Sequence, residues 1–456
     1  MTKAKRHVDM CEGPIFTNML RFLLPLMLTA LIQKFYNAAD SIVVGRAAGE
    51  AALAGVGVTG SISTLILNLF LGGSAGVSVV LGRAIGAGSK TEISRIVHTA
   101  FCISVTFGTA IALIGVLFAE PLLMLMKVNA EIMPHAKIYM QIIFAGKVPA
   151  MIYNFGAGML RAKGDSKRPL YIITVSAILN IILNLVFVVL FQMGAAGVGL
   201  ATVLAQLYSA VAVLYCFIND DGDTRFYVRK LRFHKTEFFE IMKVGIPAGL
   251  QSVLTSFANV MIQSSVNTFS TAAIAGSSAA ASVGTFYYSA VHSVFLATGP
   301  FVSRNVGAKK YDRIKKIIGS AMLFATFIGI IETIITLLFG KALIGIYQPG
   351  NTEAIENGYI RLIIVGCTYA VCGYMETINA ALRSLGYSFV GMMSSAIGMC
   401  GIRSLWVVTV FAAVGTFESL FICFPISWLV TFIFNSIMFL LVFHRFKKKN
   451  EALSEV

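Results

Sequence analysis

Charged residues are scarce in this sequence. Only 12% of the 456 residues are Asp, Glu, Lys or Arg, whereas 57% are hydrophobic and the mean hydropathy is +0.81. A soluble domain carries about 25% charged residues, so the composition excludes an ordinary soluble protein and indicates that lipid is the main solvent. The length suffices for twelve membrane-spanning helices of ~20 residues with short loops, and it leaves no room for a large soluble domain.

Cysteine is also rare, and its spacing predicts no site. Six of the seven cysteines fall inside apolar segments, and no Cys-x-x-Cys pair occurs. The sequence therefore predicts neither a disulfide framework nor a metal site. An intramembrane enzyme would need His, Asp or Cys residues clustered at metal or nucleophile spacing. No such cluster is found in the sequence, and we expect a protein that is not an enzyme.

Twelve long apolar segments predict an all-α polytopic membrane protein. They cover residues 16–44, 52–81, 96–118, 135–160, 169–191, 196–218, 242–268, 273–302, 315–339, 357–382, 388–413 and 418–443. Of the 36 Lys and Arg residues, 27 lie in or beside loops on the side of the N-terminus and five on the opposite side. This asymmetry follows the positive-inside rule, and it predicts a protein of the cell (cytoplasmic) membrane with both termini in the cytoplasm. The net charge of +15 thus reports topology and predicts no nucleic-acid partner.

The two halves of the chain share an ordered set of landmarks. Residues 21–26 match 243–248, 52–55 match 273–276, 82–87 match 303–308, and 160–164 match 382–386, always at an offset of 221 or 222. Since each half has an even number of spans, both halves enter the membrane from the same side and the repeats are parallel. Two facing six-helix lobes with a cleft between them favour a transporter that works by alternating access.

The repeat also predicts the domain boundaries. We expect an N-terminal lobe at 1–218, a cytoplasmic linker at 219–236, a C-terminal lobe at 237–446 and a cytoplasmic tail at 447–456. The linker is the longest charged connection in the chain. It is either a hinge between the lobes or a passive tether, and both interpretations stay open.

Asp40 is a carboxyl residue well inside the first predicted span. A charge at the centre of a span costs at least ~2.5 kcal/mol on insertion scales, so intramembrane acids are candidates for function. Asp40 shares a helical face with Gln33, Tyr36 and Asn37, at spacings of seven, four and three residues. The second half has Ile262 at the corresponding position. Asp40 could exchange a proton for a cation, or it could merely satisfy polar neighbours.

Other spans of the first half add uncharged polar residues. Asn180 and Asn184 are four residues apart and therefore lie on one helical face. Asn154 lies near the inner end of the fourth span, and Thr202 lies in the sixth. Interhelical hydrogen bonds from such residues are worth only ~0.6 kcal/mol on average in membranes. Each is therefore a candidate for helix packing as well as for a site.

Five further charged residues of the predicted spans are candidates for interactions inside the membrane. Lys34 and Lys147 lie at middling depth, and either could form an ion pair with the first-span carboxyl. In the second half, depth along the helices pairs Arg403 with Glu332, whereas proximity in the sequence would pair it with Glu376. We expect a structural salt bridge from Arg403 to one of these acids.

This ordered set of residues resembles the multidrug and toxic compound extrusion (MATE) family, in particular its DinF- and YoeA-like bacterial branch. The segments that carry the resemblance are 36–46, 52–57, 82–88, 160–169, 194–202, 376–386 and 401–403. The resemblance covers all twelve spans. It implies V-shaped lobes that export amphipathic organic cations in exchange for H⁺ or Na⁺.

The resemblance also implies a cation site in the first half. Its acid is matched by Asp40 and its polar residues by Asn154, Asn180 and Thr202. The family often has an aspartate where this chain has Asn184, and this departure favours H⁺ over a complete Na⁺ site at Asp40. The candidates that complete the coupling site and line the substrate cleft are Asn184, Gln33, Tyr36, Asn37, Glu376 and Arg403.

A different kind of transporter stays open as the alternative. A lipid-linked oligosaccharide flippase of the wider superfamily should line its cleft with several cationic residues to bind pyrophosphate. Lys34, Lys147 and Arg403 are few for that purpose. We therefore expect a monomeric antiporter of small organic cations in the lipid bilayer. We expect it to use no cofactor other than its coupling ion, H⁺ or possibly Na⁺.

Overall fold

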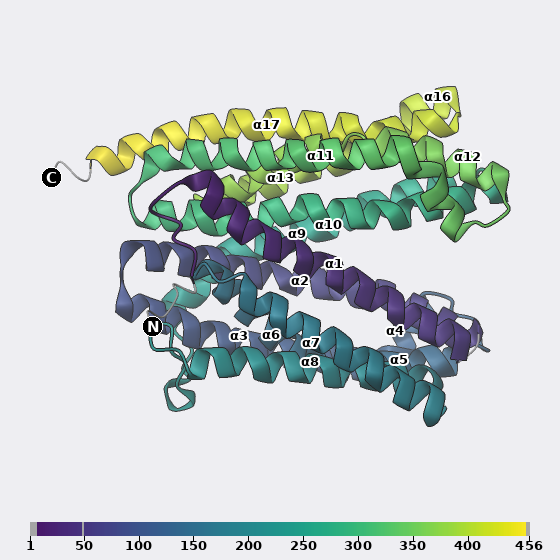
Figure 1. Cartoon of the computed structure of the whole chain (residues 1–456), viewed down its shortest axis with the longest axis horizontal. Helices are drawn as coiled ribbons and strands as arrows, with labels where there is room; N and C mark the ends of the chain where they lie inside the picture. The colour runs from purple at the N-terminus through teal and green to yellow at the C-terminus, as the bar shows by residue number, and fades with distance from the viewer. Residues whose placement is uncertain (1–6, 48–49, 453–456) are drawn as a thin grey trace. The chain divides into compact units, whose positions relative to one another are not determined.

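The computed structural model describes residues 7–47 and 50–452, and this part of the chain is helical almost throughout, without a β-strand (Figure 1). The helices of the first half are α1 (Ile15–Ala47), α2 (Glu50–Ala87), α3 (Lys90–Leu117), α4 (Ala119–Leu125), α5 (Met133–Ala145), α6 (Lys147–Ala162), α7 (Lys167–Asn184), the π-helical η1 (Leu185–Leu190), α8 (Gly194–Ile218) and the short 3₁₀ turn η2 (Val228–Lys230). Those of the second half are α9 (Lys235–Val266), α10 (Thr271–Gly307), α11 (Tyr311–Tyr347), α12 (Thr352–Arg361), η3 (Leu362–Gly366), α13 (Tyr369–Ser384), α14 (Ser388–Ser395), η4 (Ala396–Gly401), α15 (Ile402–Trp406), η5 (Val407–Phe411), α16 (Ala412–Val414) and α17 (Phe417–Ala452).

Each of the twelve predicted spans coincides with a helix or with consecutive helical segments, which confirms the all-α fold class. Ten of the described helical stretches are long and apolar enough to cross a membrane by length and composition. The other two are the α5–α6 pair and α10. Gly146 separates α5 from α6 so that each is short, and α10 is rich in Ser and Thr.

The chain forms two compact units, and each is described by itself. Of the described residues, 7–8, 24–47 and 50–249 form the first unit, and 9–23 and 250–452 form the second. The boundaries thus fall inside α1 and α9, close to the repeated residues Pro25 and Pro247. The domain limits expected from the linker at 219–236 stay a prediction.

The first unit contains most of α1 and the beginning of α9. Its buried apolar core runs from α2, α3 and α6 to Ile241 and Val244 of α9. Gly72 of α2 has no space for a side chain, because a Cβ atom there would lie 2.2 Å from the carbonyl oxygen of Gly245. Small residues at such positions let membrane helices approach closely. The first turns of α9 are therefore an integral part of this unit.

The second unit contains the first turns of α1. Phe16 stacks on Phe324 of α11 with ring centroids 4.6 Å apart, and the buried Phe22 meets Phe301 of α10 edge-on at 5.8 Å. The rest of the core comes from α9, α10, α13 and α17. Each unit is therefore completed by the beginning of a helix whose later turns belong to the other.

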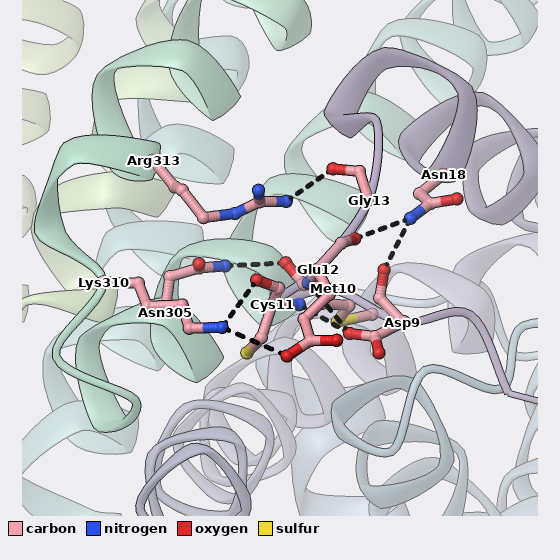
Figure 2. A network of polar contacts seen from close by, with 9 residues as sticks. All are labelled: Asp9, Met10, Cys11, Glu12, Gly13, Asn18, Asn305, Lys310 and Arg313. Carbon is pink, nitrogen blue, oxygen red and sulfur yellow. Dashed lines mark hydrogen bonds and ion pairs between the residues drawn. The ribbon is translucent and has the colours of Figure 1, made fainter.

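A network of polar contacts holds the segment before α1, residues 9–13, against the rest of the second unit (Figure 2). Three side chains donate hydrogen bonds to its backbone carbonyls: Asn305 Nδ2 to Met10 at 2.8 Å, Lys310 Nζ to Cys11 at 3.2 Å and Arg313 Nη2 to Gly13 at 3.1 Å. Asn18 Nδ2 closes the segment on itself by donating to the carbonyls of Asp9 and Glu12. The first half has Ala84 where the second has Asn305, so this anchor belongs to the second half alone.

We predict that Asn305→Ala destabilises the protein. Asn305 is fully buried, and its amide also donates to the carbonyl of Phe301 at 2.8 Å. Removal of this amide leaves the carbonyls of Met10 and Phe301 without its hydrogen bonds, which lowers the free energy of unfolding by about 1–3 kcal/mol. A lower midpoint of thermal unfolding of the purified protein would show the loss. Asn357→Ala is the matched control, because Asn357 bonds only within its own helix, to the carbonyl of Glu353. An equal loss in both variants would contradict the anchoring role.

Candidate functional site

Asp40 lies on α1 with only 9% of its side chain exposed, and each of its carboxyl oxygens receives a hydrogen bond. Asn184 Nδ2, at the end of α7, donates to Oδ1 at 2.5 Å. Thr202 Oγ1, on α8, donates to Oδ2 at 3.4 Å. Side chains from three helices that are distant in the sequence therefore meet at one buried carboxyl group.

The donors of Asp40 are themselves connected. Asn184 Nδ2 also donates to Asn180 Oδ1 at 3.1 Å, and Asn180 Nδ2 donates to Thr202 Oγ1 at 3.5 Å. Both asparagines are completely buried. We call Asp40, Asn180, Asn184 and Thr202 the Asp40 cluster. One polar atom of this cluster, the buried Asn184 Oδ1, accepts no hydrogen bond from any described residue.

Local structure explains how these residues meet. Asn180 and Asn184 are one helical turn apart and project from one face of α7, which packs against α8. Directly after Asn184 the α-helix changes into the π-helical η1, and such wider turns often occur at functional sites. A small apolar cluster that includes Val188 and Val198 packs against Val43, one turn beyond Asp40. Along α1, the polar Asp40 cluster is thus followed within one turn by an apolar cluster.

The remaining first-half candidates have different positions. Tyr36 lies near enough to Asp40 to interact with its charge, and Gln33 is exposed. The side chain of Asn37 is outside the part of the structure that is described. Asn154 is not brought to the Asp40 cluster, because its amide donates to the carbonyl of Ala150 in its own helix at 2.8 Å.

Neither lysine of the first half pairs with Asp40. Lys147 is buried on α6, with Nζ 5.4 Å from the centre of the Phe144 ring. Lys34 is half-buried on α1. Within residues 7–47 and 50–452, no ion pair joins either lysine to Asp40. The acid is instead satisfied by uncharged donors.

The predicted salt bridge of Arg403 is wrong. Its Nη1 donates to Asn259 Oδ1 of α9 at 3.0 Å, and its Nε donates to Ser427 Oγ of α17 at 3.0 Å. The guanidinium also lies over the Phe424 ring at 4.2 Å. No ion pair with an acid is found for it in the described part of the chain. Depth along the helices predicted that Arg403 lies level with Glu332. The Arg403 side chain is instead directed toward α9 and α17. Glu332 lies on α11, which packs against α10 and α13.

Glu376, the other candidate acid, is buried on α13 at the position that corresponds to Asn154. Its nearest charge is Arg383, two turns further along the same helix. Arg383 Nη2 donates to Gln251 Oε1 of α9 at 2.9 Å, and Gln251 Nε2 donates to Ser395 Oγ at 2.9 Å. The structure thus places Glu376 near a second buried polar cluster and away from Arg403.

Two parts of these sites were not expected from the sequence. Tyr139 of α5 lies near enough to Asp40 to interact with its charge. Gln251 and Arg383 form the centre of the second polar cluster. Gln251 follows Pro247 by one turn, and Arg383 is part of the repeated landmark at 382–386. These positions were signals that could have singled them out.

Comparisons with known proteins agree with this architecture. A family model described as MatE matches residues 25–186 and, a second time, residues 247–409. The chain is 27% identical over 426 residues to "Probable multidrug resistance protein YpnP" of Bacillus subtilis, covering 86% of this chain and 92% of YpnP. It is 24% identical over 379 residues to "Probable multidrug resistance protein YoeA" of the same organism, covering 82% of each chain.

A solved structure shows the same fold. A crystal structure of MATE in the straight conformation superposes with a TM-score of 0.91 at 20% identity, covering 98% of this chain and 100% of that one. At this level of identity the likeness concerns the fold alone. The two matches of the family model begin at Pro25 and Pro247, the repeated prolines near the boundaries of the two units.

We predict that Asn184→Ala impairs transport far more than Asn154→Ala. The first change removes the donor of Asp40 Oδ1, and a lost bond of about 1.4 kcal/mol corresponds to a tenfold effect. The second removes a bond within one helix, so its effect should stay within about twofold. Initial rates of ethidium transport, measured in vesicles with equal amounts of each variant, would test this. Equal losses would mean that the Asp40 cluster has no special role.

Proposed function

Because the chain belongs to the MatE family of multidrug efflux transporters, we propose that it exports amphipathic organic cations in exchange for protons, with Asp40 as the proton-binding group. The transporter works by alternating access as a monomer, with no cofactor besides the coupling ion. The excess of Lys and Arg on the side of the N-terminus supports an orientation with both termini in the cytoplasm.

The observation that carries this proposal is the hydrogen bonding of Asp40. In its ionised form the carboxylate is satisfied by two donors, Asn184 Nδ2 and Thr202 Oγ1. In its protonated form the new O–H group needs an acceptor. Asn184 Oδ1 is buried, unused and part of the same amide group, so a rotation of that amide supplies it. The cluster therefore contains a partner for both protonation states, as a site that gains and loses a proton requires.

The same contacts favour H⁺ over Na⁺ as the coupling ion. Hard cations prefer several oxygen ligands with strong negative charge. The Asp40 cluster contains one carboxylate, and its other oxygens belong to the uncharged amides of Asn180 and Asn184 and the hydroxyl of Thr202. An aspartate at position 184 would add the second charge, but this chain has asparagine there.

Competition between H⁺ and the organic cation for Asp40 couples the transport of one to that of the other. An organic cation gains from an ionised carboxylate and from aromatic faces such as those of Tyr36 and Tyr139, which lie near Asp40. Protonation removes that charge and lowers the affinity for the cation. Since proton and substrate bind the same group in turn, the binding of one favours release of the other, and this reciprocal coupling makes exchange possible.

We predict that Asp40→Asn abolishes efflux driven by a pH gradient. The asparagine keeps the size of the side chain but cannot exchange a proton. Ethidium efflux measured in everted vesicles should fall to the level of vesicles without the protein. Asp312→Asn is the control, because the side chain of Asp312 is 92% exposed and far from the cluster in sequence. Undiminished efflux by the Asp40 variant would remove Asp40 from the coupling mechanism.

The choice of ion needs a separate experiment. Ethidium efflux by the unaltered protein is compared under an imposed pH gradient and under an imposed Na⁺ gradient. We expect the pH gradient to drive efflux and the Na⁺ gradient to have no effect. Efflux driven by Na⁺ alone would show that the proton assignment is wrong. A drug-sensitive host that gains resistance from the protein would argue against the flippase alternative.

A further inference from the structure

The second unit contains a buried acid that the proposed exchange at Asp40 does not use. Glu332, on α11, is only 4% exposed, and neither of its carboxyl oxygens has a hydrogen-bond partner among the residues that the structure describes. We propose that Glu332 is a second proton-binding group of the transporter, which carries a proton in the second unit. This inference rests on the proposed proton-coupled function and extends it to a residue in the other half.

Glu332 lies on the face of α11 that is directed into the helix bundle. The buried residues of this part of the helix recur at intervals of three or four: Ala325, Gly329, Glu332, Thr336, Gly340 and Ile344. The intervening residues Ile331 and Ile334 are 56% and 50% exposed. Glu332 thus lies on the buried face of α11. On that face an acid packs no better than Leu or Ala would.

Close helix packing on either side of Glu332 restricts its surroundings. A Cβ atom on Gly329 would lie 2.6 Å from Ala370 Cβ of α13. Two turns beyond the acid, a Cβ atom on Gly340 would lie 2.8 Å from the Tyr359 ring of α12. Because both neighbouring contacts are this tight, the carboxyl group is held inside the bundle.

The titratable groups near Glu332 in the described part of the chain are tyrosines and cysteines. Those that interact with it electrostatically are Tyr287 of α10 and Tyr369 and Cys372 of α13. Cys367, after η3, is bonded to Thr333 through its backbone carbonyl. Among the described residues, no lysine or arginine forms an ion pair with Glu332.

The nearby guanidinium groups have other partners. Arg361 of α12 donates to the carbonyl of Ser277 at 3.0 Å and lies over the Phe421 ring. Arg403 is bonded to Asn259 and Ser427. An ionised carboxylate at position 332 would therefore be buried without a donor or a counter-charge, which costs several kcal/mol. In this arrangement Glu332 is the neutral, protonated acid.

A tyrosine hydroxyl offers a route for the release of this proton. Tyr287 Oη accepts a hydrogen bond from Thr336 Oγ1 at 3.2 Å, and its own hydrogen is used in no bond within the described part of the chain. The hydroxyl of Tyr369, in contrast, donates to the carbonyl of Gly284 at 3.1 Å. When a conformational change turns the Tyr287 hydroxyl toward Glu332, the carboxylate gains the donor that its ionised form needs.

Infrared spectroscopy tests the protonation of Glu332 without reference to transport. A buried protonated carboxyl has its own C=O stretching band, and an ionised one does not. We expect this band in the unaltered protein at neutral pH, its loss in Glu332→Gln, a shift of its position in Glu332→Asp and no change in Glu376→Gln. A spectrum unchanged by Glu332→Gln would overturn the inference. Thermal unfolding of each variant checks that the spectra come from folded protein, and Glu332→Asp keeps the test available if the glutamine variant does not fold.

The coupling role is tested by the protons exchanged per ethidium molecule in proteoliposomes. Glu332→Gln should halve this ratio, whereas Asp312→Asn should leave it unchanged. An unchanged ratio in Glu332→Gln would show that Glu332 keeps its proton throughout and would overturn the coupling role. The two proposals fail separately: loss of the infrared band in Glu332→Gln together with normal efflux by Asp40→Asn would remove Asp40 and leave Glu332 as the proton carrier.

Discussion

A polar group inside a membrane protein must find its partner within the protein, because lipid offers none. This constraint organises both units of the transporter. Asp40 draws donors from α7 and α8, and Arg403 draws acceptors from α9 and α17. These contacts join helices that an apolar interface alone would leave free to slide. Among the buried polar atoms without a partner in the described part of the chain are Asn184 Oδ1 and both oxygens of Glu332. They are informative because they belong to, or adjoin, a buried acid that could gain and lose a proton.

The two halves share a scaffold but differ in chemistry. The repeat is visible in the landmarks, in the paired prolines and in the two matches of the family model. The ionisable groups do not follow it: Asp40 has Ile262 as its counterpart, and Asn154 has Glu376. The two halves therefore share a scaffold, while each contains its own buried acids in the described part of the chain.

The sequence predicted the fold well, because spans depend on hydrophobic length and repeats depend on order. Helical spacing placed Asn180 and Asn184 on one face, but it was the resemblance to the MATE family that related them to Asp40 and Thr202. The same resemblance included Asn154, which bonds within its own helix instead. The prediction failed for Arg403, because depth along a helix says nothing of how that helix is rotated about its axis. Gln251 and Arg383 were missed because their positions beside Pro247 and within the repeated landmark do not show that the two side chains are hydrogen-bonded to each other.

Both α1 and α9 begin in one unit and continue in the other, and this affects how the protein folds during its synthesis. The first turns of α1 complete the second unit, and the first turns of α9 complete the first. During synthesis the first half emerges without residues 235–249, so its bundle remains unfinished until α9 has been inserted. The product of either half gene alone would likewise lack a piece of its core.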